Sequence, residues 1–599
     1  MSYLLPWLLI LPIAGAMIGV FLPTPRASKT WALTVSLLTA ALAVCLAWGF
    51  FHTPSSSSLR IVFGPEAGEA SPLRLTAIGA AFSLGIDAIS LWLVLLTVLL
   101  VPASLAASFA AIQHRQKEYY NWMLLLMAAM IGVFISRDLL LFYVFFELTL
   151  IPMFFIIGIW GGSDRDYAAA KFFLFTFTGS VFTLAVVIFL GLHADPITRG
   201  PSFDLNDVVR YAQSLDPSIR WWLLLGLLAG FAVKVPLFPL HTWLPLAHTE
   251  APTAGSVILA GVLLKLGTYG LLRLAVPIGL VSTAAGGVAF PSLLRFIGLL
   301  CVIGIIYGAL VAWVQKDIKK LVAYSSVSHL GFCVLGLVAF NTNGIGVQGS
   351  VLYMINHGLS TGAMFLVIGM IYERFHTRDI NQLSGVARRM PVLGFFFVFF
   401  VLSSIGLPGL NGFVSEFLTI LAAFTSPHLG TGFGTFAALG VILGAVYMLH
   451  LTARVIFGPL KTPDASQLHG AGAIHATPLG ADIGKREIGL LIPIALAVLV
   501  LGVMPTPLLK SILQPSQEVL QTLAPARPSH LHSAQITKQF SPLSPLPVHR
   551  ERDRVRVVSN AANSPIDPLV GTLTPTLSQS IGRGGNGATS SSYSAKFAP

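Results

Sequence analysis

Six ionisable side chains stand inside long apolar stretches of this chain. They are two lysines, two glutamates and two histidines: Lys234, Lys265, Glu147, Glu416, His329 and His357. A charge at the centre of a bilayer costs ~2.5–3.5 kcal/mol even on lenient insertion scales, so such residues usually mark a functional path. All three residue types can take up and release a proton. The set therefore predicts proton transfer inside a membrane.

The stretch around Lys234 is the clearest of these. Lys234 follows the apolar segment 221–231 and precedes Pro236, Pro239 and Pro245, each of which lacks a backbone donor. A broken helix at membrane depth requires protein or water to cover the freed backbone groups. A lysine and a break at one depth therefore indicate an internal polar site. The alternative is a proline-kinked helix whose lysine extends to an interface.

Glu147 is the best candidate for a partner of Lys234. It lies nine residues after Asp138 in an otherwise apolar segment that continues to Pro152. Two unit charges at ~4 Å attract by ~4 kcal/mol at an effective dielectric of ~20, enough to control whether the lysine holds its proton. Movement of Glu147 toward or away from Lys234 would then switch the lysine. The alternative is a static buried ion pair with a structural role.

The other four residues continue the series. Lys265 is the next charge along the membrane plane, and His329 and His357 follow as a relay, since histidine titrates near neutrality. Each histidine is equally well explained as a hydrogen-bonded core residue. Glu416 follows a second helix break, in the position that we match to Lys234; a capped half-helix is the alternative. No cysteine or paired acid accompanies the histidines, which disfavours a metal site.

Composition bounds the class of protein. The chain has 599 residues, of which 55% are hydrophobic and 10% charged, and its mean hydropathy is +0.80. Soluble domains carry about 25% charged residues, so this is a polytopic membrane protein. The three cysteines are far apart, and no CxxC or glycine-rich phosphate motif is present. We expect no redox cofactor, metal or nucleotide in this chain. Residues 1–22 lack a basic start and read as a first span.

Apolar runs of about 20 residues predict an all-α protein of about fourteen transmembrane helices. The predicted spans are 3–22, 30–51, 85–108, 120–136, 138–158, 168–192, 221–247, 254–276, 291–313, 319–340, 346–372, 391–426, 434–457 and 487–509.

Spans four to eight and nine to thirteen match in outline, which predicts two five-helix repeats. Arg137-Asp138 precedes span five and Lys316-Asp317 precedes span ten. Because five is an odd number, the second copy enters from the opposite side and is inverted, and paired broken helices in such repeats point to ion sites. The predicted parts are an N-terminal three-helix segment 1–110, repeats 120–276 and 291–458 with breaks at 234–239 and 406–412, a last helix 487–511, and a disordered tail 512–599.

Basic residues predict the orientation. Loops after odd-numbered spans hold more lysine and arginine than loops after even-numbered spans, so the former are cytoplasmic and both termini lie outside the cytoplasm. We expect a multi-pass protein of the cell inner membrane. Residues 550–556 form a basic run in a tail rich in Pro, Ser, Thr and Gly, a composition that buries no core. This run would lie on the wrong side of the membrane for nucleic acid, so no nucleic-acid partner is expected.

The stretch Phe238–Ser256, FPLHTWLPLAHTEAPTAGS, resembles the signature of the antiporter-like membrane subunits of respiratory complex I. The resemblance extends over residues 1 to about 510. The family also includes subunits of Mrp-type cation/proton antiporters and of hydrogenase-4-type membrane complexes. Within it the chain is most similar to the subunit M branch of the bacterial NADH–quinone oxidoreductases, the counterpart of mitochondrial subunit 4. The L and Mrp relatives usually have lysine where this chain has Glu416.

The resemblance implies the roles of the six residues. Glu147 matches the family's essential span-five glutamate, Lys234 its span-seven lysine and Lys265 its connecting lysine. His329 and His357 match its relay histidines, and Glu416 its terminal acid.

The resemblance also implies partners. NADH, FMN, iron–sulfur clusters and quinone would be bound by other subunits, and this chain would sit beside L-type, N-type and small membrane subunits. One departure is Leu246, which stands where the family commonly has aspartate and removes an acid from the proton entry. Alternatives are a subunit of an Mrp-type antiporter or of a hydrogenase, and a spacer that only transmits force between subunits.

Overall fold

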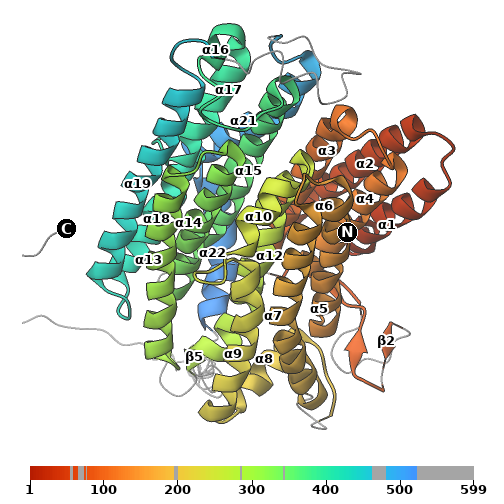
Figure 1. The fold of residues 1–599 in the computed structure, drawn as a ribbon. Helices are drawn as coiled ribbons and strands as arrows, with labels where there is room; N and C mark the ends of the chain where they lie inside the picture. The colour runs from red at the N-terminus through yellow and green to blue at the C-terminus, as the bar shows by residue number, and fades with distance from the viewer. Residues whose placement is uncertain are drawn as a thin grey trace, which may run out of the picture. The chain divides into compact units, whose positions relative to one another are not determined.

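Long helices packed side by side form nearly all of the computed structural model (Figure 1). The structure describes residues 1–53, 59–64, 73–75, 77–194, 200–282, 287–340, 344–461 and 481–521. The chain divides into a unit 1–527 and a unit 528–599, and all described residues belong to the first.

The helices before residue 290 include two π-helical segments, η1 and η2. They are α1 (Leu4–Val20), α2 (Pro25–His52), α3 (Ala88–Ala111), α4 (Gln116–Ile135), α5 (Leu139–Leu148), α6 (Leu150–Trp160), α7 (Arg165–His193), α8 (Leu205–Ser214), α9 (Pro217–Lys234), α10 (Trp243–Glu250), α11 (Thr253–Ile258), η1 (Leu259–Leu263), α12 (Leu264–Gly270) and η2 (Leu271–Leu280).

The later helices are mostly single long elements. They are α13 (Pro291–Trp313), α14 (Ile318–Val338), α15 (Ile345–Phe375), α16 (Val386–Arg389), α17 (Pro391–Ser404), α18 (Asn411–Thr425), α19 (Thr431–Val455), α21 (Lys485–Val503) and α22 (Thr506–Gln521).

Three two-stranded antiparallel sheets complete the described part of the chain. They pair β1 (Ile61–Phe63) with β4 (Leu84–Ile86), β2 (Arg74–Leu75) with β3 (Ala80–Ala81), and β5 (Val281–Ser282) with β6 (Gly287–Val288). These short strand pairs lie outside the long apolar helices, and the fold is mostly helical, as predicted.

Eleven helical segments among the described residues are long and apolar enough to cross a membrane, which makes this a multi-pass membrane protein. The shorter apolar helices are α1, α17 and α18. The exact number of fourteen crossings stays a prediction. A crossing made of two half-helices, such as α17 and α18, has no single helix long enough to be counted as a span.

Burial identifies the central helices. In the apolar stretch of α15 that could cross the membrane, 100% of the residues are buried within the chain. The buried share is 94% in α14 and in Thr253–Leu280, and 28% in α21. These three central segments carry Lys265, His329 and His357, so the structure places those residues in the protein interior and away from lipid.

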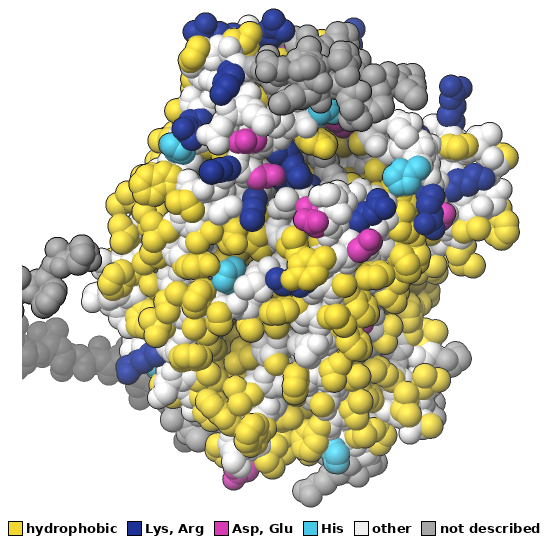
Figure 2. All heavy atoms as spheres, in the orientation of Figure 1, with side chains coloured by type: hydrophobic (Ala, Val, Ile, Leu, Met, Phe, Trp, Pro, Cys, Tyr) yellow, Lys and Arg dark blue, Asp and Glu magenta, His cyan; other side chains and the backbone are white. Residues whose placement is uncertain are grey.

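The surface in Figure 2 matches a protein that crosses a bilayer. Hydrophobic side chains cover the middle of the face drawn there, and lysine and arginine gather toward the end that carries α16. A band of this kind faces hydrocarbon, and a basic end is typical of the cytoplasmic side.

The first predicted helix break is confirmed between α9 and α10. Past the end of α9, the Leu237 amide donates to the Ala232 carbonyl at 2.9 Å and the Leu240 amide donates to the Leu237 carbonyl at 2.6 Å. The Trp243 indole N–H donates to the Val233 carbonyl at 2.9 Å. The backbone groups that the break frees are thus covered by protein, as a membrane interior requires.

The second break, between α17 and α18, repeats this pattern. The Leu407 amide donates to the Leu402 carbonyl at 3.1 Å, and the Leu410 amide donates to the Leu407 carbonyl at 3.0 Å. The two breaks share one hydrogen-bond pattern. In each, an amide donates to the carbonyl five residues earlier, and the amide three residues further on then donates to the carbonyl three residues earlier. This likeness supports the predicted internal repeat; the five-helix division and the inversion stay predictions.

One sequence match is wrong. We matched Glu416 to Lys234, but Lys234 is the last residue of α9, the half-helix before its break, whereas Glu416 lies in α18, the half-helix after its break. Aligned on the shared hydrogen bonds, Leu240 corresponds to Leu410. Glu416 then corresponds to Leu246, since each lies six residues further on. The two repeats therefore place their charges on opposite sides of their breaks.

The starts of spans five and ten are also built alike. The Asp138 carboxylate accepts from the Leu140 and Leu141 amides at 2.9 and 3.0 Å. The Asp317 carboxylate accepts from the amides of the second and third residues after it at 2.7 and 3.0 Å. These carboxylates cap α5 and α14, in which the first amides have no helical partner.

The C-terminal boundary differs from the prediction. The last predicted helix 487–511 is two helices, α21 and α22, and helix continues to Gln521, inside the predicted tail 512–599. The Trp92 indole of α3 donates to Ser511 Oγ of α22 at 2.9 Å, which helps to hold α22 on the bundle. Short amphipathic helices escape a search for apolar spans. The rest of the predicted tail, with its basic run, lies outside the described residues.

Candidate functional site

Lys234 ends α9 and contacts the junction of α5 and α6. Its Nζ donates to Thr149 Oγ1 at 3.2 Å and to the Phe146 carbonyl at 3.4 Å. It also lies 4.2 Å from the centre of the Phe146 ring, a cation–π contact. The helix C-terminus adds a favourable partial negative charge. The ammonium group is therefore held by neutral acceptors deep in the protein.

Glu147 lies beside these contacts without joining them. Its Oε1 is buried and has no hydrogen-bond partner among the described residues. No ion pair within 4.0 Å involves Lys234 in the described part of the chain, so the static ion pair is not formed in this conformation. Lys234 instead bonds Phe146 and Thr149, on either side of Glu147.

Lys265 lies at the start of α12, directly after the π-helical turn η1. Its Nζ donates to the Ala260 carbonyl at 2.5 Å and lies 2.7 Å from His357 Nδ1 of α15. The helices meet closely here, since a Cβ on Gly358 would lie 2.8 Å from the Gly261 carbonyl. Glycine at both positions lets a fully buried lysine reach a histidine of the neighbouring helix.

The two histidines adjoin each other. The ring centres of His329 and His357 lie 5.6 Å apart at 74°. His357 Nε2 has no hydrogen-bond partner among the described residues. From the sequence we expected His329 before His357, but His357 contacts Lys265, so the spatial order is reversed. The packing of the helices, and not the order of the residues along the chain, sets the spatial order Lys265, His357, His329.

Two tyrosines that we did not single out from the sequence adjoin His329, and one of them also reaches Glu416. Tyr447 Oη lies 3.3 Å from His329 Nε2. The ring centre of Tyr353 lies 6.0 Å from that of His329, and its hydroxyl donates to Glu416 Oε1 at 3.1 Å. Tyrosine is common in apolar segments, so no sequence signal marked these two.

Glu416 is buried on α18 beside the break. Gly406 has a φ of +73°, and a Cβ there would overlap the Glu416 carboxylate. Glycine at 406 thus allows both the left-handed backbone of the break and the position of the acid.

A polar cluster holds the break beside Glu416. Asn411 Oδ1 accepts from Ser403 Oγ at 2.6 Å and from Ser360 Oγ at 3.3 Å. Asn356 Nδ2 donates to the Asn411 carbonyl at 2.5 Å and to Ser415 Oγ at 3.0 Å. The alternative for Glu416 was a half-helix capped by Asn411 and Ser415; their side chains instead join α15, α17 and α18. This network fixes α18, and with it Glu416, relative to Tyr353 on α15.

The position of Leu246 bears on proton entry. Leu246 is half-buried among apolar side chains, so this side of α10 offers no acid there. His248, two residues on, is fully buried and stacks on Phe365 with ring centres 4.7 Å apart. Neither of its ring nitrogens has a partner among the described residues.

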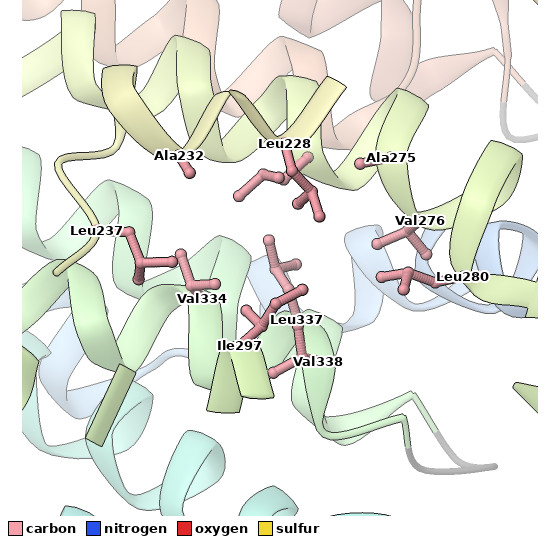
Figure 3. A pocket seen from close by; sticks show the side chains of 11 residues that line it. Leu228, Ala232, Leu237, Ala275, Val276, Leu280, Ile297, Val334, Leu337 and Val338 are labelled. Carbon is pink, nitrogen blue, oxygen red and sulfur yellow. The ribbon is translucent and has the colours of Figure 1, made fainter. Parts of the chain in front are cut away.

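Apolar side chains line a crevice between the two repeats, built from α9, the first break, η2, α13 and α14. Figure 3 shows Leu228, Ala232, Leu237, Val334 and Leu337 pointing into it. Every lining residue is aliphatic. Apolar spaces of this kind stay dry, so the crevice gives a proton no route.

The described residues contain no group of three or more His, Cys, Asp or Glu that could hold a metal ion. What the chain does offer is a row of titratable groups: Lys265, His357, His329, Tyr353 and Glu416. Lys234 and Glu147 form a separate site at the first break. Such an arrangement can pass protons.

Residues 136–444 match the family model described as "NADH:quinone oxidoreductase/Mrp antiporter, TM". The chain is 40% identical over 523 residues to NADH-quinone oxidoreductase subunit M of Rhodobacter capsulatus, covering 84% of this chain and 94% of that one. It belongs to the NADH-quinone oxidoreductase subunit M family. Another member, from Pseudomonas aeruginosa, is 37% identical over 517 residues, which cover 84% of this chain and 95% of that one.

Solved structures agree on the fold of this subunit M family member. A chain of respiratory complex I from Thermus thermophilus aligns with a TM-score of 0.73 and 28% identity, covering 87% of this chain and 100% of that one. A chain of the Mrp complex from Dietzia aligns with a TM-score of 0.71 over 89% of this chain and 99% of that one. Its identity of 21% shows the fold alone.

Proposed function

We propose that this subunit M family member translocates protons within a respiratory NADH–quinone oxidoreductase. The row of buried titratable groups supports this most directly. Lys265 Nζ lies 2.7 Å from His357, the rings of His357 and His329 lie 5.6 Å apart, and Tyr353 donates to Glu416 at 3.1 Å. Buried polar groups of this kind in a membrane interior mark ion pathways.

Protons enter from the cytoplasm near Lys234, whose charge is set by the distance to Glu147. They pass along the membrane plane through Lys265, His357 and His329, and they leave outward near Glu416. The two ends of this path coincide with the two helix breaks, where half-helix ends and freed backbone groups favour ion sites. In the predicted orientation, with both termini outside the cytoplasm, the path runs from the first repeat into the second.

The aliphatic crevice supports lateral passage. It adjoins Ala232 and Leu237 on either side of Lys234, and its other walls are η2, α13 and α14. In the predicted orientation the residues of these segments that line the crevice lie in the outer half of the membrane. A proton at Lys234 therefore meets a dry barrier outward, and the path that we propose takes it sideways to Lys265.

The energy comes from outside this chain. Moving one proton against 100 mV costs ~2.3 kcal/mol, which quinone reduction supplies in other subunits that hold NADH, FMN, iron–sulfur clusters and quinone. This chain assembles with other membrane subunits of complex I in the inner membrane. An Mrp-type or hydrogenase-type complex is disfavoured by the subunit M relatives, which are about 40% identical over most of the chain.

The test is proton pumping in inverted membrane vesicles that oxidise NADH. We expect Lys234→Ala and Glu147→Ala each to lower pumping by about a hundredfold, the lower end of what a positioned proton-transfer group contributes. Lys320→Ala, which removes an exposed lysine, is the matched control and should pump normally.

Complex content and NADH oxidation with an artificial acceptor show whether each variant assembles. Full pumping by both Lys234→Ala and Glu147→Ala would refute the proposal. Loss of assembly with an unchanged ratio of protons to electrons would favour the spacer role instead.

A further inference from the structure

We propose that the Tyr353 hydroxyl is a proton carrier that delivers the proton from the histidine pair to Glu416. This inference rests on the proposed function and adds a residue to it. The six ionisable residues leave a gap between His329 and Glu416, and Tyr353 is the side chain whose polar group contacts the acid across that gap.

The contacts around Tyr353 fit a fixed carrier. The residue is 3% exposed, and its ring stacks on Phe332 with centres 5.8 Å apart at 8°. Its hydroxyl donates to Glu416 Oε1 at 3.1 Å, and its ring meets His329 edge-on at 6.0 Å. It lies on α15 one turn before His357. Tyr353 therefore contacts both the relay and the terminal acid.

The proton balance is simple. The phenol O–H bond breaks as its proton moves to the Glu416 carboxylate. In the same step the phenol oxygen gains a proton that leaves the His329 imidazolium through a bridging water, because the two residues meet through their rings. The phenol is restored, His329 becomes neutral and Glu416 becomes a carboxylic acid. No net charge accumulates on the tyrosine, and no oxidant or reductant is consumed.

Tyr447 provides the internal comparison. Its hydroxyl lies 3.3 Å from His329 Nε2, and no contact with Glu416 is among its hydrogen bonds. This places Tyr447 as a positioning residue that orients the imidazole. Replacement of Tyr447 by phenylalanine should disturb the relay less than replacement of Tyr353.

The experiment uses the assembled complex in inverted vesicles. Tyr353→Phe keeps the stack on Phe332 and removes only the hydroxyl. We expect NADH-driven proton pumping to fall by about a hundredfold, with normal complex content and normal NADH oxidation by an artificial acceptor. Tyr372→Phe is the matched control, since Tyr372 lies on the same helix, is 44% exposed and should be silent.

A second measurement separates a carrier from a structural hydroxyl. Fluorinated tyrosine at 353 keeps the shape and the hydrogen bond but makes the phenol more acidic. A carrier predicts a changed pumping rate and a changed solvent deuterium isotope effect, and a structural hydroxyl predicts neither. Fluorinated tyrosine at 372 is the control.

Glu416→Gln distinguishes the two proposals. If Glu416→Gln abolishes pumping while Tyr353→Phe and the fluorinated variant pump normally, the carrier role is wrong and the proposed function stands. If Glu416→Gln also pumps normally, the proposed path itself fails.

Discussion

Burial decides what a charged pair contributes in this chain. Arg374 and Glu487 form two parallel hydrogen bonds of 2.9 and 2.7 Å, with side chains 2% and 10% exposed. Removing one member of a buried pair strands the other charge and costs about 3–5 kcal/mol. We expect Glu487→Gln to lower the free energy of unfolding by this amount in equilibrium denaturant titrations of the purified protein in detergent.

The matched control is the exposed pair of Arg115 and Glu118, whose side chains are 53% and 48% exposed. Exposed pairs contribute little because solvent screens them. Glu118→Gln should therefore leave the unfolding curve unchanged. Equal losses in Glu487→Gln and Glu118→Gln would show that the buried pair has no special weight.

Single residues differed in how visible they were in the sequence. Lys265 and Glu416 stood out because a charge within an apolar run has few structural explanations. Tyr353 and Thr149 did not, because tyrosine and threonine occur throughout apolar helices and gain a role only through a partner on another helix. Hydrogen-bond partners depend on helix packing, which a single sequence does not specify. The identity of the acceptors of Lys234 was missed for the same reason.

Three glycines allow the second helix break to be tested in steps. A Cβ added at Gly444, within α19, would meet no heavy atom within 4 Å, and Gly409 has equally open space but a φ of +93°. Gly406 combines a φ of +73° with the Glu416 carboxylate in the way of a Cβ. A side chain in the left-handed region costs about 1–2 kcal/mol.

We therefore expect Gly444→Ala to be neutral, Gly409→Ala to lower stability alone, and Gly406→Ala to lower both stability and proton pumping. Thermal stability of the purified complex and pumping in inverted vesicles measure the two effects. Normal pumping by Gly406→Ala would mean that the position of Glu416 beside the break is unimportant.

Helix breaks were predictable and helix irregularities were not. Proline and glycine at 236–239 and 406–412 remove backbone donors or permit unusual dihedrals, and both breaks lie where these residues predicted them. The π-helical turn Leu259–Leu263, whose Ala260 carbonyl accepts from Lys265, has no such mark in the sequence, since every residue of the turn is apolar or glycine. We matched Lys234 to Glu416 because both are charged residues near a break. The backbone hydrogen bonds of the two breaks give a different alignment, in which Glu416 corresponds to Leu246.

At the scale of the whole molecule, the relay is carried by its most buried segments. The central helices α14 and α15 carry His329 and His357, and the Thr253–Leu280 segment carries Lys265. In the predicted division into repeats, the relay lies where the two copies meet. A path built this way needs a defined orientation, because entry and exit occur at non-equivalent ends.

The orientation can be tested by labelling. The basic end in Figure 2 predicts that the α3–α4 loop is cytoplasmic and that the segment between α8 and α9 is outside. Gln113 in the α3–α4 loop and Ser218 at the start of α9 are exposed sites, and Cys301 and Cys333 are buried. In a Cys45→Ala background, Gln113→Cys should react with a membrane-impermeant maleimide only in inside-out vesicles. Ser218→Cys should react only in right-side-out vesicles.

The reverse pattern would contradict the orientation and with it the direction of transfer. Protons would then enter near Glu416 and leave near Lys234, and the aliphatic crevice beside Ala232 and Leu237 would face the cytoplasm. The row of contacts from Lys265 to Glu416 would still form one path, because its distances do not depend on the side from which it is loaded. Labelling therefore tests the direction of transfer separately from the existence of the path.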